Sequence, residues 1–94
     1  MTSKGAEMIA AERQRQIEEE GWTPEHDAQH TNGELADAAA AYALTDQWDN
    51  IKHNVWPWAP QWWKPKDRIR DLVRAGALIA AEIDRLLALD NARG

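Results

Sequence analysis

The sequence predicts a single all-α domain of three main helices. Three stretches, at about 5–20, 31–44 and 66–89, carry apolar residues at the spacing of one helix face. The residues between the second and third stretches are rich in Trp and Pro, which rules out one continuous helix there. A chain of 94 residues makes one domain at most, so we expect residues 1–94 to fold as one helical unit.

The first helix is predicted over residues 5–20. Ser3 is its candidate N-cap, and Gly21 fits the left-handed position that closes a helix, which would bring Trp22 onto Ile17. The apolar face is narrow, and it consists of Ala6, Ile9, Ala10 and Ile17 with the stem of Arg13.

The second helix is predicted to open at a capping box. Thr31 and Glu34 have the S/T-x-x-E spacing in which each side chain caps a backbone N–H of the other's turn. The run Ala38–Ala41 has little side-chain bulk, so another helix backbone could approach it closely. The expected buried face is Leu35, Ala38, Ala39 and Tyr42.

The third helix has the clearest periodicity. Its apolar residues follow a 3-4-3-4-3 spacing, which predicts the buried stripe Ile69, Leu72, Gly76, Ile79, Ile83 and Leu86. Leu78 then falls on the polar face, where an isolated monomer would prefer a charge. We therefore expect Leu78 to lie in an interface between copies of the chain.

The connection at residues 45–65, which we call the Trp/Pro-rich segment, is expected to be irregular and folded over the helices. Two interpretations follow from its indoles, which either cover the thin core or form an exposed patch that anchors a partner. The residues in question are Trp48, Trp56, Trp58, Trp62 and Trp63.

Composition limits the function classes. The formal net charge is −5, which argues against a general nucleic-acid or anionic-membrane binder, because such proteins need a concentrated basic surface. The chain has no cysteine and no apolar run of membrane-spanning length, so we expect a cytoplasmic protein. A domain this short buries a thin core, which favours self-association as a dimer or higher oligomer.

The stretch between the first two helices holds the candidate polar site. If the backbone stays near-helical there, five side chains share one region and could bind a divalent metal. These are His26, Asp27, His30, Glu34 and Asp37. The alternative is structural, with Glu34 in the capping box, Asp37 in the first helical turn, and the others satisfying turn backbone or pairing with Arg13 and Arg15.

Three segments carry a resemblance to known proteins. They read AERQRQIEEEGWTPEHDAQHTNGELADAAAAYAL, WPWAPQWWKP and DLVRAGALIAAEIDRL. From about Ala10 to Leu86 the chain resembles a widespread set of small proteins encoded by bacteriophages and prophages. The resemblance implies a phage origin and action inside a bacterial host cell, and it implies no activity.

A weaker resemblance is to MazG-like all-α nucleotide pyrophosphohydrolases, some of which begin with a stretch similar to Glu12–Gln16. That family is oligomeric and holds magnesium with ExxE and ExxD carboxylates. This chain has one ExxD, Glu34 to Asp37, and no ExxE. If the chain shares this activity, we expect Mg²⁺ or Mn²⁺ at the candidate polar site, where His26, Asp27 and His30 would stand in for the missing carboxylates; these three are not part of the family's ligand pattern. Lys64, Lys66 or Arg70 would then meet phosphates.

Two functions are therefore expected. The first is an acidic interaction protein that binds and inhibits or modulates a host or defence protein, of which a CRISPR-system inhibitor is one form. The second is a metal-dependent MazG-like nucleotide pyrophosphohydrolase. The single ExxD leaves enzymatic activity open.

Overall fold

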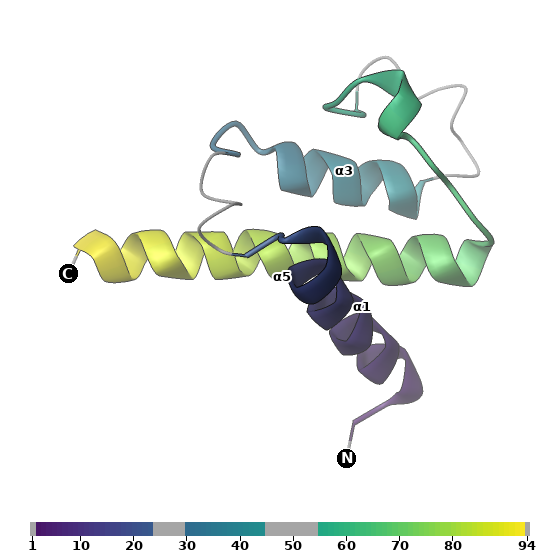
Figure 1. Ribbon diagram of the computed structural model, residues 1–94, viewed down its shortest axis with the longest axis horizontal. Helices are drawn as coiled ribbons and strands as arrows, with labels where there is room; N and C mark the ends of the chain where they lie inside the picture. Colours follow the sequence, from purple (N-terminus) through teal and green to yellow (C-terminus); the bar gives the residue numbers. More distant parts are fainter. Residues whose placement is uncertain (1, 24–29, 45–54, 94) are drawn as a thin grey trace.

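The computed structural model describes residues 2–23, 30–44 and 55–93 of the chain (Figure 1). Every regular element in these ranges is helical, which confirms the all-α fold class and the three main helices. The elements are α1 (Lys4–Glu20), α3 (Glu34–Ala43), the short 3-10 helix η2 (Pro60–Trp62) and α5 (Arg68–Arg93).

Helix α5 is the long axis around which the other elements are arranged. Figure 1 shows α3 lying along α5 and running in the opposite direction, while α1 crosses α5 at a steep angle. The residues around η2 lie beside α3, and the chain measures 42 × 34 × 22 Å. No helix in the described ranges combines the length and the apolar character that a membrane crossing requires.

Small residues form the contact between α3 and α5. Alanines on both helices are fully or almost fully buried, and Leu35, Tyr42 and Leu78 fill the remaining space. Because alanine adds only one carbon beyond the backbone, the two helices can pack closely, as the alanine run of α3 led us to expect. The buried alanines are Ala38, Ala39 and Ala41 on α3 and Ala75, Ala77 and Ala81 on α5.

The face of α5 that packs inward is not the predicted one. Leu78 is only 2% exposed and belongs to the core, so the expectation that it lies on a polar face is wrong, and it offers no surface to a second copy. The large aliphatic side chains of the predicted stripe are instead exposed. The physical reason is that α3 packs against the small-residue side of α5, where the helix backbones can approach each other. The exposed members are Ile69, Leu72, Ile79, Ile83 and Leu86.

Helix α1 begins and ends as predicted but packs differently. The Ser3 hydroxyl accepts a hydrogen bond from Ala6 N–H at 3.1 Å, and Gly21 closes the helix at φ 70°. Ala6 and Ala10 are exposed, whereas Glu12 and Gln16 are buried. The buried face of α1 is therefore partly polar.

The bounds of two helices shift from the prediction. Helix α3 starts at Glu34 rather than at residue 31, since Gly33 takes the N-cap position with φ 81° and no side-chain cap. The Glu34 carboxylate accepts from Asn32 N–H at 2.6 Å, so the expected reciprocal pair with Thr31 does not form. Helix α5 starts two residues later than predicted and runs four residues further.

Candidate functional site: a tryptophan-lined pocket

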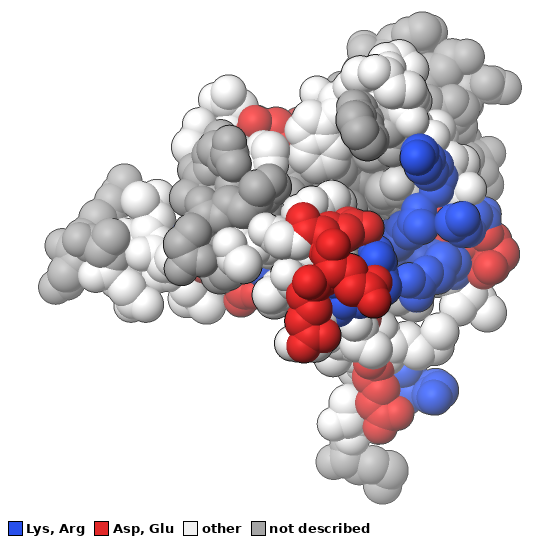
Figure 2. Space-filling model, viewed as in Figure 1, with Lys and Arg blue, Asp and Glu red and all other residues white. Residues whose placement is uncertain are grey.

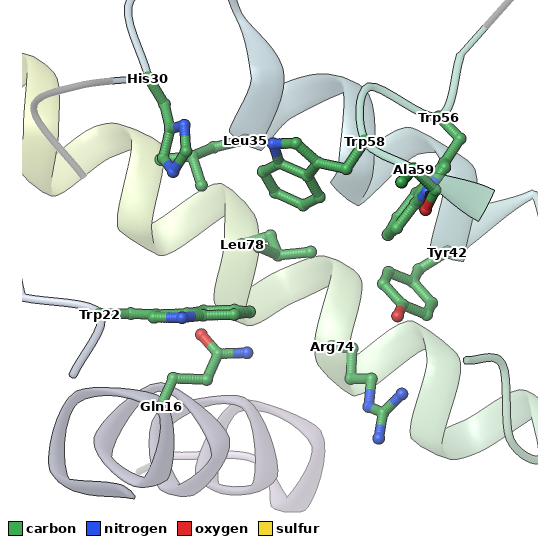
Figure 3. A pocket seen from close by; sticks show the side chains of 10 residues that line it. All are labelled: Gln16, Trp22, His30, Leu35, Tyr42, Trp56, Trp58, Ala59, Arg74 and Leu78. Carbon is green, nitrogen blue, oxygen red and sulfur yellow. Dashed lines mark hydrogen bonds between the residues drawn. The ribbon is translucent and has the colours of Figure 1, made fainter. Parts of the chain in front are cut away.

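A pocket of about 470 Å³ opens between α1, α3, α5 and the residues before η2 (Figure 3). Its volume lies in the range of sites that take small molecules or a partner's side chain. Aromatic rings make up half of its lining. The lining residues are Gln16, Trp22, His30, Leu35, Tyr42, Trp56, Trp58, Ala59, Arg74 and Leu78.

The aromatic wall is one connected cluster. Trp56 packs edge-on against Trp58 with ring centroids 5.4 Å apart, and it meets Tyr42 at 5.6 Å. The His30 ring contacts Trp58 edge-on at 5.5 Å. Such edge-to-face pairs stabilise one another beyond simple burial, so the wall is held in a defined shape.

A second layer behind the wall supports it. Trp63 stacks on Tyr42 at 4.7 Å and lies 4.8 Å from Trp56, although it does not line the pocket itself. The Trp56 indole N–H donates to the Ala59 carbonyl at 3.1 Å, which folds residues 56–59 into a turn. The turn orients the Trp56 ring in the wall.

Trp22 forms the opposite side of the pocket, and Arg13 supports it. The Arg13 guanidinium donates to the Trp22 carbonyl at 2.8 Å and pairs with the Asp84 carboxylate of α5 at 3.2 Å. Helix α1 ends at Gly21, and the chain then turns so that the backbone N–H of Trp22 donates to the backbone carbonyl of Gln16 at 3.1 Å. The capped end of α1 thus places Trp22 against the core.

Gln16 adds a buried amide to the pocket, whose lining also includes His30 and Arg74. Its side-chain Nε2 donates to the Glu12 carboxylate at 3.1 Å, which fixes the orientation of the amide because a carboxylate only accepts. The Oε1 atom is then left as the one buried side-chain oxygen or nitrogen of the described residues without a hydrogen-bond partner. Figure 3 shows this oxygen turned toward Trp22. A buried acceptor without a donor is costly, so the site favours a group that donates to it.

A buried ionic cluster holds Gln16 in place. The Glu12 carboxylate, whose side chain is 1% exposed, accepts from Arg15 at 2.8 Å and pairs with Arg70 of α5. Burial alone would raise the pKa of Glu12, but the Arg15 hydrogen bond and the charges of Arg15 and Arg70 outweigh it and lower that pKa. Glu12 is therefore a stable carboxylate that anchors both Gln16 and the α1–α5 contact.

Arg74 closes the pocket beside Tyr42. Its guanidinium lies 5.6 Å from the Tyr42 ring centroid and donates to the Lys64 carbonyl at 2.6 Å. Burial raises the pKa of the Tyr42 hydroxyl, and the nearby Arg74 charge offsets part of the shift. Tyr42 is neutral at physiological pH, so it presents an apolar ring to the pocket.

The predicted metal-binding residues are only partly within the described ranges. His26 and Asp27 lie outside them. His30 Nδ1 and Glu34 Oε2 are 3.6 Å apart, while Asp37 is exposed one turn further along α3. The described residues contain no group of three metal-ligating side chains, and His30 contributes its ring to the pocket.

The predicted partner-binding tryptophans separate into groups. Trp56 and Trp58 line the pocket, and Trp63 supports it from behind. These three are half-buried and pack against the core, as the covering interpretation expects. Trp48 and the side chain of Trp62 lie outside the described part of the structure.

Sequence reasoning missed Gln16, Arg74 and Leu78 as pocket residues. A usable signal was present for Gln16, because Ile9, Glu12, Arg13 and Gln16 recur at the spacing of one helix face. The face predicted for this helix included the stem of Arg13 but neither Glu12 nor Gln16. Their burial depends on pairing with Arg70 and Asp84, which are far away in sequence.

Charges are unevenly distributed around the site. Figure 2 shows acidic side chains gathered over the C-terminal half of α1 and basic side chains beside them, toward the start of α5. Arg15 links the two groups through contacts with Glu19 at 3.4 Å and Glu20 at 3.1 Å. These contacts offset the unfavourable position of the glutamates at the helix C-terminus.

Comparison of the chain with protein-family models, curated proteins and solved structures gives no match.

Proposed function

We propose that the chain is a phage- or prophage-encoded binding protein that captures a host or defence protein inside the bacterial cell. The observation that carries this proposal is the aromatic pocket with the unpartnered Gln16 Oε1. The setting comes from the resemblance to small phage proteins. The pocket takes residues from each of the three segments on which that resemblance rests, including Gln16, Trp56 and Arg74.

The pocket suits an aromatic side chain of the partner that carries an N–H donor, as tryptophan does. Its walls of Trp22 and Trp58 favour a flat apolar group, since offset and edge-on ring contacts are the stable arrangements. A donor on that group would satisfy Gln16 Oε1 once the Trp22 ring moves to admit it, because the oxygen is buried in the unbound chain, and a plain aliphatic side chain has no such donor. Buried aromatic anchors of this kind supply most of the binding energy in protein interfaces.

The charge distribution supports a protein partner with a basic surface beside that anchor. The acidic group lies over the C-terminal half of α1, the helix that carries Gln16, and the net charge of the chain is −5. Complementary charges at the rim raise association rates and select partners, while the apolar centre provides affinity.

The metal-dependent hydrolase stays a prediction. None of the described contacts adds a carboxylate ligand to the pair Glu34 and Asp37, and Glu34 already accepts from Asn32 N–H. Its own backbone N–H, that of Asn32 and the nearby His30 lower the pKa of Glu34, so it is a carboxylate at neutral pH.

Two measurements test the proposed function. In the first, indole N–H signals are followed by NMR while N-acetyl-tryptophanamide or N-acetyl-leucinamide is added. We expect saturable shifts with the tryptophan probe that Gln16→Met reduces at least tenfold in affinity. Gln14→Met makes the same substitution on the exposed side of α1 and should bind as the parent does.

In the second, the chain is expressed in bacteria that carry a defence system, and plaques of a sensitive phage are counted. Parental protein should raise the plaque count, and folded Trp58→Ala should not. Pyrophosphate release from nucleotides with Mg²⁺ or Mn²⁺, abolished by Glu34→Gln and Asp37→Asn, would replace the binding proposal with the enzyme. An unchanged affinity in Gln16→Met would remove the pocket from recognition.

We also propose that the chain acts as a homodimer, as its thin core predicts.

A further inference from the structure

The exposed side of α5 carries a continuous row of large aliphatic side chains. These five residues, which we call the α5 stripe, are each between 43% and 64% exposed, and they are Ile69, Leu72, Ile79, Ile83 and Leu86. Helix α3 packs on the small-residue side of α5, and α1 contacts α5 at Gly76, so the two helices leave the five large side chains of the row exposed.

Gly76 would interrupt the row, but Ile9 of α1 fills the position. A Cβ atom at residue 76 would lie 2.5 Å from Ile9 Cδ1, so the isoleucine side chain occupies the place of the missing one. Ile9 is itself only half-buried. On α5 itself the row from Ile69 to Leu86 therefore contains no polar side chain.

The spacing has the heptad form of a helix-pairing seam. Ile69, Gly76 and Ile83 occupy one core position of the repeat, and Leu72, Ile79 and Leu86 occupy the other. The described helices of one chain leave most of this seam exposed to solvent. Contiguous apolar patches of this kind mark interaction sites in soluble proteins.

We infer that the α5 stripe is the interface with a second copy of the same chain, paired antiparallel. This inference rests on the proposed homodimer and names its surface and register, and it is independent of the pocket. A heptad seam can pair with its own copy about a two-fold axis, because each copy then presents the same residues to the other. Antiparallel pairing sets Ile69 against Leu86 of the second copy and Leu72 against Ile83, while Ile79 meets the Ile9 side chain that covers Gly76.

The area is sufficient for a stable pair. The five exposed side chains present on the order of 500 Å² per copy, so pairing covers on the order of 1,000 Å² from them alone, which meets the lower limit for a specific interface. Antiparallel helices also set their dipoles in opposition, which is favourable. The second copy is thus an occupant that matches the row in length, chemistry and symmetry.

Light scattering coupled to size exclusion tests the surface. The parental chain of 10.7 kDa should elute with about twice that mass. Leu72→Glu and Ile83→Glu should each return to the mass of one chain while keeping parental helicity by circular dichroism. Leu44→Glu is the matched control, since Leu44 is 38% exposed at the end of α3, away from the row, and its mass should stay at the parental value.

Disulfide cross-linking tests the register. Because the chain has no native cysteine, every disulfide formed must join the introduced residues. A mixture of Leu72→Cys and Ile83→Cys chains should form disulfide-linked pairs under mild oxidation, whereas each variant alone should form few. A single-chain mass for the parental protein at every concentration overturns the interface, as does a parental mass for Ile83→Glu. Rapid cross-linking of Leu72→Cys with itself overturns the antiparallel register. Gln16→Met should keep the parental mass, so failure at the pocket and failure at this interface remain distinguishable.

Discussion

The two apolar sides of α5 differ in the size of their side chains and in what covers them. On one side Ala75, Leu78 and Ala81 pack against the alanines of α3. On the other, the α5 stripe projects large aliphatic side chains into solvent. The side with small residues stabilises the monomer, because small side chains let the backbones of α3 and α5 pack closely. The side with large residues stays exposed in the monomer.

The difference can be tested with one substitution made on each side. Leu78→Ala should lower the free energy of unfolding by about 3 kcal/mol, since it opens a cavity that the neighbouring alanine side chains are too small to fill. Leu72→Ala should cost under about 0.5 kcal/mol in the monomer, because the side chain is already exposed. Urea unfolding, performed in an Ile83→Glu background so that both proteins are monomeric, measures the two values. Equal losses in the free energy of unfolding would show that the two sides of α5 contribute equally to the stability of the monomer.

The periodicity of α5 was visible in the sequence, but its assignment to the core was wrong. A 3-4-3-4-3 pattern reports that a helix has an apolar stripe, and it does not report which partner covers that stripe. The alanines around Leu78 carry little weight in such a pattern, although Ala38–Ala41 in α3 provided the matching signal for close approach. Ser3, Gly21 and the three helices were predictable because their causes are local.

The pocket was less predictable than the fold. Its aromatic wall was foreseeable in part, since Trp56 and Trp58 were already singled out as covering or binding residues. Gln16 shares a helix face with Ile9 and Arg13, but its burial also requires Glu12 to meet Arg70 across 58 positions of sequence. Long-range ion pairs leave no periodic trace, so polar residues on a buried helix face are assigned to solvent by default.

The ionic cluster of Glu12, Arg15 and Arg70 joins α1 to α5, and its contribution to stability can be measured next. Glu12→Gln should cost about 2 kcal/mol at pH 7, as it removes the charge that Arg15 and Arg70 share. The pKa of Glu12 is lowered in the folded state, so the stability that its charge provides is complete above the unfolded value of about 4.3 and is lost as pH falls through the folded value.

The expected signature is a gap in melting temperature between parent and Glu12→Gln that is widest near pH 7. The gap should narrow as the solution is acidified below about pH 4, where the parental carboxyl becomes protonated. Glu18→Gln is the matched control on the exposed face of α1, and it should show a small gap with little dependence on pH. A gap for Glu12→Gln that stays constant to pH 2.5 would contradict the charged cluster.

A smaller change in the free energy of unfolding than at Glu12 is expected at Gly76, where α1 contacts α5 through Ile9. Gly76→Leu should cost about 1 kcal/mol, since overpacking against Ile9 exceeds the gain in helix propensity. Combining it with Ile9→Ala should cost less than the two single changes together, because the new side chain then occupies the space that Ile9 leaves. Additive losses in urea unfolding would mean that Ile9 does not fill that position. The double variant also restores a leucine to the α5 stripe, so it should keep the dimer mass that the seam predicts.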